Sequence, residues 1–135
     1  YNWAGGPTVP ANEWSHVALV ITPTSATIYL NGVGYTRTAA HAAVTFSSVF
    51  QLGIDRGNTA RNYSGLMDEV AIYDRALSQN EIRELMNLTR NNPNAGSMPA
   101  ADASLKAYYQ FNEGNGKPGY DRTGLNHTNL AAPNT

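Results

Sequence analysis

The stretch GLMDEVAIYDRALSQNEIRELM, residues 65–86, decides the fold of this chain. Its first half alternates: one side of an extended chain carries Leu66, Asp68, Val70 and Ile72, and the other carries Met67, Glu69, Ala71 and Tyr73. That period of two predicts a strand. The period changes after Asp74, where one apolar stripe is formed by Leu77, Ile82, Leu85 and Met86. The stripe predicts one short helix, at about residues 78–86.

The start of this helix carries its own signal. Ser78 stands where an N-cap is needed, and Glu81 follows three residues later. The Ser78 hydroxyl can accept the Glu81 amide while the Glu81 carboxylate accepts the Ser78 amide, which is a capping box. The pair therefore predicts that the helix begins directly after Ser78.

Two further strands are predicted near the amino end. Residues 14–21, WSHVALVI, are apolar almost throughout and stop at a proline, which is typical of a buried strand with Trp14 in the core. Residues 26–30 alternate and run into Asn31 and Gly32, the residue types that accept positive φ in a hairpin turn.

Composition limits what kind of protein this is. The chain has 135 residues, enough for one domain, and it is 41% hydrophobic and 14% charged. Its net charge of −1 gives no basic stripe, so we expect no nucleic-acid partner. No apolar run approaches the length of a membrane span. The absence of cysteine fits a bacterial secreted protein better than a disulfide-stapled ectodomain.

The strand and helix of residues 65–86 resemble the closing segment of a known protein family. Bacterial laminin-G-like, pentraxin-like modules of the concanavalin A-type jelly roll close with G-x-x-D-E-V-x-I-Y-x-R-A-L-S-x-x-E-I, and every lettered position is met in residues 65–82. The same family's central pair, W-x-H-V-A-L-V followed by T-I-Y-L-N-G, is met in residues 14–20 and 27–32. The resemblance implies an all-β, antiparallel jelly-roll β-sandwich at an extracellular or cell-surface location.

The order of the resemblance is inverted. Residues 105–116 match the opening L-x-A-Y-Y-x-F-x-E-G-x-G of such a module, and residues 121–127 match its D-x-T-G-x-N-H. We therefore divide the chain into later strands and closing helix (1–90), a linker (91–103) and opening strand or strands (104–135). The middle strands of a usual module have no counterpart here.

Three explanations fit this inversion. The chain is cut from a tandem array, or it is permuted so that residues 105–111 pair back into the same sandwich, or that strand is donated to a neighbouring copy. An unpaired apolar strand would be an aggregation template, so we expect residues 105–111 to pair back into the same sandwich or to be donated to a neighbouring copy.

Catalytic pairs are not evident. A glycosidase needs two carboxylates that face each other across a cleft, whereas Asp68 and Glu69 are adjacent and point to opposite faces of a strand. No nucleophile elbow occurs either. The sequence predicts a protein that is not an enzyme.

Calcium is the metal that the resemblance implies. Jelly rolls of this type often hold one structural calcium ion, and carrying its ligands over by residue singles out Asp68, Glu113, Gly114 and Asp121. Such oxygen ligands suit calcium. The alternative is that Asp68 caps a turn and Asp121 makes an Asx-turn.

Sugar binding needs exposed aromatic rings beside amide and guanidinium donors. The loops carry these types at Tyr1, Trp3, Arg56, Arg61, Asn62 and Tyr63, although loop packing and solvated charge would also explain them. We predict a non-catalytic binding module for a glycan or surface polymer within a larger secreted or cell-surface protein. The alternative is a structural or adhesion subunit of a repeat array or fibre, assembled by exchange of residues 105–111 between copies.

Overall fold

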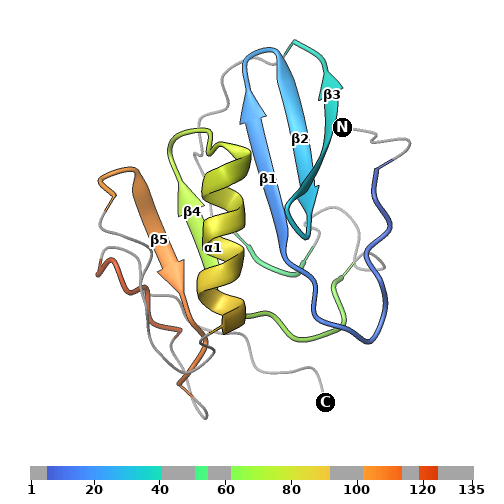
Figure 1. Ribbon diagram of the computed structural model, residues 1–135. Coiled ribbons are helices and arrows are strands. Elements are labelled where there is room, and N and C mark those ends of the chain that lie inside the picture. Colours follow the sequence, from blue (N-terminus) through green and yellow to red (C-terminus); the bar gives the residue numbers. More distant parts are fainter. Residues whose placement is uncertain (1–5, 41–50, 55–61, 92–101, 114–118, 125–135) are drawn as a thin grey trace.

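The computed structural model describes residues 6–40, 51–54, 62–91, 102–113 and 119–124. Its elements are β1 (Val17–Thr22), β2 (Ser25–Leu30), β3 (Val33–Thr38), β4 (Val70–Tyr73), α1 (Gln79–Asn91) and β5 (Leu105–Tyr109) (Figure 1). Every pairing between these strands is antiparallel. The predicted all-β class with one helix is confirmed.

The first sheet has the order β1–β2–β3. The β2–β3 hairpin turns at Asn31 (φ 49°) and Gly32 (φ 76°), as their positive-φ preference predicts. Asn31 also fastens the strand before it, because its Oδ1 accepts the His16 amide at 2.9 Å and its amide donates to the His16 carbonyl at 2.9 Å.

The second sheet joins β4 to β5, which lie far apart in the sequence. Val70 is opposite Tyr109 and Ile72 is opposite Ala107, and the register shifts between Ile72 and Tyr73. Tyr109 also forms a bridge with Asp121 on its other side. The aromatic segment near the carboxyl end is therefore paired within one copy of the chain.

The helix begins where the capping box predicts. The Ser78 amide donates to Glu81 Oε2 at 2.7 Å, and the Glu81 amide donates to Ser78 Oγ at 3.3 Å. The helix continues to Asn91, five residues beyond the predicted end at 86. The amino-terminal end of the helix is anchored to the β2–β3 hairpin, since Gln79 Nε2 and Arg83 Nε donate to the Gly32 carbonyl at 2.9 and 3.1 Å.

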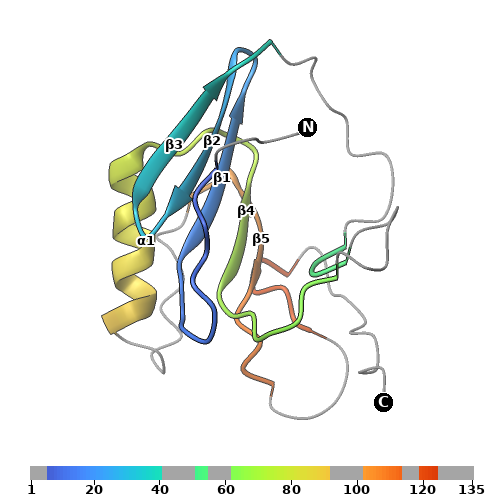
Figure 2. The ribbon, with the colours of Figure 1, turned by 90° about the vertical axis from the view of Figure 1, so that its right-hand side faces the viewer.

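The core lies around β5 and one face of the helix. Tyr108 and Ile82 are almost completely buried, and they are accompanied by Ala26, Leu105, Ala107 and Tyr109. Figure 1 shows the two sheets side by side with α1 over the place where they meet, and Figure 2 shows α1 to one side of the strands. The helix thus covers the junction between the two halves of the chain.

The predicted burial of β1 is wrong on one face, and so is the placement of Trp14 in the core. Val17, Leu19 and Ile21 are 53%, 59% and 58% exposed, and Trp14 is 68% exposed. Trp14 lies before the first residue of β1, outside the sheet, which is why the strand does not bury it. Alternation along β1 places its three odd-numbered apolar residues on an exposed face.

Candidate functional site

Tyr63 is an exposed aromatic ring that is held at both ends. Its amide donates to the Gly53 carbonyl at 2.8 Å, and its hydroxyl donates to the Leu66 carbonyl at 2.9 Å. The ring lies against Gly65, where an added Cβ would be 2.7 Å from the hydroxyl oxygen. Although it is held in this way, Tyr63 is 56% exposed. It therefore presents a fixed ring to solvent.

The hydrogen-bond partners of Tyr63, and the residues next to them or to Tyr63 in the chain, include apolar side chains and an amide. Leu52, Ile54 and Leu66 are exposed to 38%, 46% and 75%, and Asn62, directly before the ring, is also exposed. An aromatic face beside apolar side chains and an amide is suited to stacking on a sugar ring while hydrogen-bonding its hydroxyls. Of the predicted sugar-binding residues, Asn62 and Tyr63 lie here; Tyr1, Trp3, Arg56 and Arg61 lie outside the described residues.

Trp14 is a second exposed aromatic residue that sequence reasoning missed. It follows the turn at residues 11–12, where Asn12 has a φ of 62°, and it precedes β1. The segments 6–16 and 62–69 both reach the lower end of the strands in Figures 1 and 2. The signal that could have found Trp14 is its position three residues ahead of the strand's apolar run, next to a turn.

Two of the predicted calcium ligands are engaged by their own turns. Asp68 is exposed, and its Oδ1 accepts the Glu69 amide at 2.9 Å. Asp121 is 2% exposed; its Oδ1 accepts the Tyr108 and Thr123 amides at 2.8 and 3.0 Å, and its Oδ2 accepts the Thr123 hydroxyl at 2.5 Å. The Asp121 contacts to Thr123 form an Asx-turn. The Tyr108 amide bond to Asp121 and the Arg122 amide bond to the Tyr108 carbonyl, at 2.8 Å, tie residues 119–124 to β5.

Of the other two predicted ligands, Glu113 lies within the described residues and accepts a backbone hydrogen bond. Glu113 Oε1 accepts the Tyr120 amide at 3.0 Å, whereas Gly114 lies outside the described residues. Within the described ranges, no three His, Cys, Asp or Glu residues gather as a metal-ligand set. The calcium site stays a prediction.

Glu69 is directed into the sheet rather than outward. Its positive φ of 54° does not fit an extended strand, so β4 begins only at the next residue. The Glu69 carboxylate accepts a hydrogen bond from the hydroxyl of the buried Tyr108. Gln110 Nε2 donates to the same hydroxyl at 3.5 Å. Burial, followed by the Glu69 carboxylate, raises the pKa of Tyr108 well above its usual range. Asp68 and Glu69 therefore have separate structural partners.

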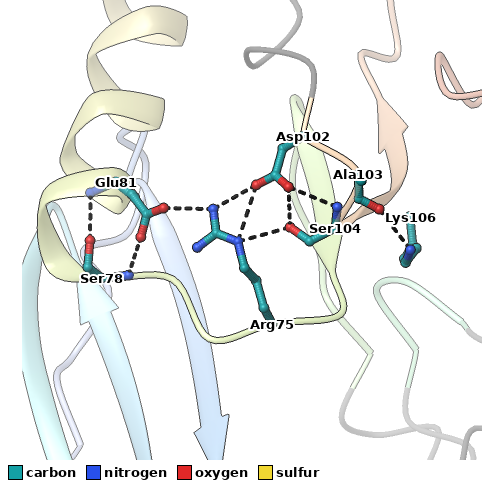
Figure 3. Close-up of polar contacts among 7 residues, drawn as sticks. All are labelled: Arg75, Ser78, Glu81, Asp102, Ala103, Ser104 and Lys106. Atoms are coloured by element: carbon teal, nitrogen blue, oxygen red, sulfur yellow. Dashed lines mark hydrogen bonds and ion pairs between the residues drawn. The ribbon is translucent and has the colours of Figure 1, made fainter.

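An ion-pair cluster connects the helix start with the entry to β5 (Figure 3). Arg75 Nη2 lies 2.7 Å from Glu81 Oε1 and 2.6 Å from Asp102 Oδ2. Arg75 Nε donates to Ser104 Oγ at 3.0 Å, and the Asp74 amide donates to the Ser104 carbonyl at 2.9 Å. We call Arg75, Glu81, Asp102 and Ser104 the Arg75 cluster. It joins residues that the sequence separates by more than twenty positions.

The hydrogen bonds of the Arg75 cluster shift the acidity of its carboxyl groups. Arg75, followed by Ser78, lowers the pKa of Glu81 to about 2. The amide and hydroxyl of Ser104, followed by Arg75, lower the pKa of Asp102 to about 2. Both carboxylates are therefore charged over the physiological range, as the pairing requires.

Antiparallel sheets and one capped helix define an all-β domain. The laminin G model of the concanavalin A-like lectin/glucanases superfamily matches residues 1–83, and the chain belongs to this superfamily. The superfamily's name covers both lectins, which bind sugars, and glucanases, which cleave them.

One solved structure is similar over part of its length. It is the crystal structure of residues 221–444 of an S-layer domain-containing protein from Clostridium thermocellum, with 26% sequence identity and a TM-score of 0.50. The match covers 59% of this chain and 42% of that one, so the chain spans less than half of that structure. A comparison with curated proteins gives no significant match. Within the described ranges, α1 is too short and too polar to cross a membrane.

Proposed function

We propose that this chain is a non-catalytic extracellular binding module that holds a glycan or another surface polymer through its loops. The exposed and doubly anchored ring of Tyr63 is the observation that carries the proposal. A ring fixed before binding loses little conformational freedom when a ligand stacks on it. Membership of a superfamily that includes lectins supports a sugar as the ligand.

A cell-surface setting is the location we propose. The similar structure belongs to an S-layer domain-containing protein, which supports a role at the outside of a cell. The separate partners of Asp68 and Glu69 support binding without cleavage, because a glycosidase needs two carboxylates directed at one bond.

Retention in native affinity gels tests the proposal. The probes are a β-1,3-glucan, a xyloglucan and a purified bacterial cell-wall polysaccharide, each cast in a separate gel. We expect at least one to retard the chain, and Tyr63→Ala to weaken that retention about fivefold, since a stacked ring contributes roughly 1 kcal/mol. Trp3→Ala is expected to weaken it as well.

Two control variants sharpen this experiment. Tyr63→Phe keeps the ring and is expected to keep most of the retention, whereas Tyr120→Ala removes a ring that is 48% exposed in the segment after β5 and should change nothing. Equal retention of Tyr63→Ala and the unaltered chain on every probe would contradict the proposal.

A structural calcium ion is a second part of the proposal, with Asp68, Glu113, Gly114 and Asp121 as its ligands. Oxygen donors of this kind fit calcium, and a bound ion stabilises the folded state by mass action. We expect millimolar calcium to raise the melting temperature by several degrees, and magnesium to raise it less. A melting curve that is unchanged between calcium and chelator would remove the site.

A further inference from the structure

One face of the first sheet is a grid of nine positions, of which Ala26 is buried and the other eight are half-buried or exposed. The register places three residues of each strand on it, in rows Val17–Leu30–Val33, Leu19–Ile28–Tyr35 and Ile21–Ala26–Arg37. Residues directly opposite each other in an antiparallel pair point to the same side. We call these nine residues the apolar face. Eight of them are uncharged and apolar or aromatic, and Arg37 occupies one corner.

The two sides of this sheet differ in composition. Apart from Val20 and Tyr29, the other side carries small and hydroxylated residues, among them Thr27 and Thr36, whose hydroxyls are hydrogen-bonded at 2.9 Å. A sheet with one side in solvent normally turns its polar residues outward. Here the second side is partly buried on β2, with Thr27 8% exposed, while the large apolar side chains of β1 and β3 on the first face are exposed.

The exposed area is large for a chain of this size. Val17, Leu19, Ile21, Val33 and Tyr35 are each between 41% and 59% exposed. Together they present roughly 400–500 Å² of apolar surface, which is near the upper end for the largest patch on a monomer. β1 is apolar on both sides, as strands covered on both sides are.

We infer that the apolar face is the contact surface between two copies of this chain, packed sheet against sheet. Two such faces would bury about 1,000 Å² once the half-buried β2 side chains are included, which is the lower limit for a specific interface. The face contains no carboxylate that would be buried unpaired, and a two-fold axis along the strands sets each Arg37 opposite Ile21 of the other copy. Like charges therefore do not meet.

This contact differs from exchange of β5, because the apolar face belongs to β1, β2 and β3 alone. It is also independent of the proposed glycan binding, since its readout is molecular mass and not retention. A dimer that forms by exchange of residues 105–111 would survive a charge placed on β1. A dimer that uses the apolar face would not.

Size-exclusion chromatography with light scattering, from about 1 to 200 µM chain, tests the inference. The unaltered chain is expected to shift reversibly from monomer to dimer across this range, as an interface near the lower size limit should. Leu19→Lys is expected to remain a monomer at every concentration, because the dimer would bury a charge. Val33→Lys repeats the test at the opposite edge of the face.

Leu66→Lys is the matched control. It makes the same substitution at a residue that is 75% exposed and lies outside the apolar face, so it should dimerise like the unaltered chain. Circular dichroism and melting curves establish that each variant is folded. A chain that is monomeric at 200 µM, or a dimer that persists in both Leu19→Lys and Val33→Lys, would overturn the inference.

Discussion

At the scale of single residues, Arg75 links the two halves of the chain. It pairs with Glu81 in the first turn of α1 and with Asp102 just before β5. Exposed ion pairs usually contribute little, but three partners on one guanidinium hold its geometry. We expect Arg75→Ala to lower the melting temperature at pH 7 by about 2–5 °C. Arg122→Ala, at an exposed arginine outside the Arg75 cluster, is the control.

The effect of Arg75→Ala on the melting temperature should depend on pH. Because the pKa values of Glu81 and Asp102 are lowered to about 2 in the folded state, their contribution to stability is present above their ordinary values of 4.5 and 3.8. It is lost as the pH falls towards 2. The gap in melting temperature between the unaltered chain and Arg75→Ala should therefore be constant from pH 7 to 5 and close between pH 4.5 and 2. A gap that does not narrow over this range would contradict the assignment.

At the scale of elements, the helix start could be predicted because its determinants are local. Ser78 and Glu81 lie within one turn and satisfy each other's amides, as their spacing requires. Ser78→Ala removes one half of this exchange, and we expect it to lower the free energy of unfolding by about 1 kcal/mol, measured by urea denaturation. Ser64→Ala, in an exposed loop, should leave it unchanged. Equal losses in both variants would argue against a capping role.

The ends of β4 and β5 could not be predicted in the same way. The alternating pattern continues through residues 66–73, yet β4 begins only at Val70 because Glu69 has positive φ and its carboxylate accepts the Tyr108 hydroxyl. These two residues lie 39 positions apart, so no local pattern contains the contact. The apolar run continues to Phe111, but β5 ends at Tyr109. Phe111 has positive φ, which does not fit an extended strand and which the apolar pattern does not predict.

Within the candidate site, residue types were predictable and exposure was not. The place of Tyr63 in a polar loop predicts a binding residue, and the structure adds the two hydrogen bonds that fix it. The position of Trp14 at the head of an apolar run predicts a core residue, yet it is exposed because the strand starts three residues later. Alternation defines two sides of a strand without stating which side faces the core.

At the scale of the whole molecule, the sequence motifs indicated that two inverted parts belong together, and the pairing of β4 with β5 brings them together in one chain. Whether residues 105–111 are also exchanged between copies stays a prediction. The chain contains no cysteine, so an engineered pair can report on this contact without background.

The most direct measurement is disulfide formation in the double variant Ile72→Cys, Ala107→Cys. These residues are opposite each other in the register, at the Cα separation that a disulfide accepts. Mild oxidation of the folded chain should give a monomer on a denaturing gel, with one disulfide joining the β4 and β5 peptides after proteolysis. Thiols that stay free in the folded chain, or disulfides found only between copies, would contradict the closure of β5 on β4 of its own chain.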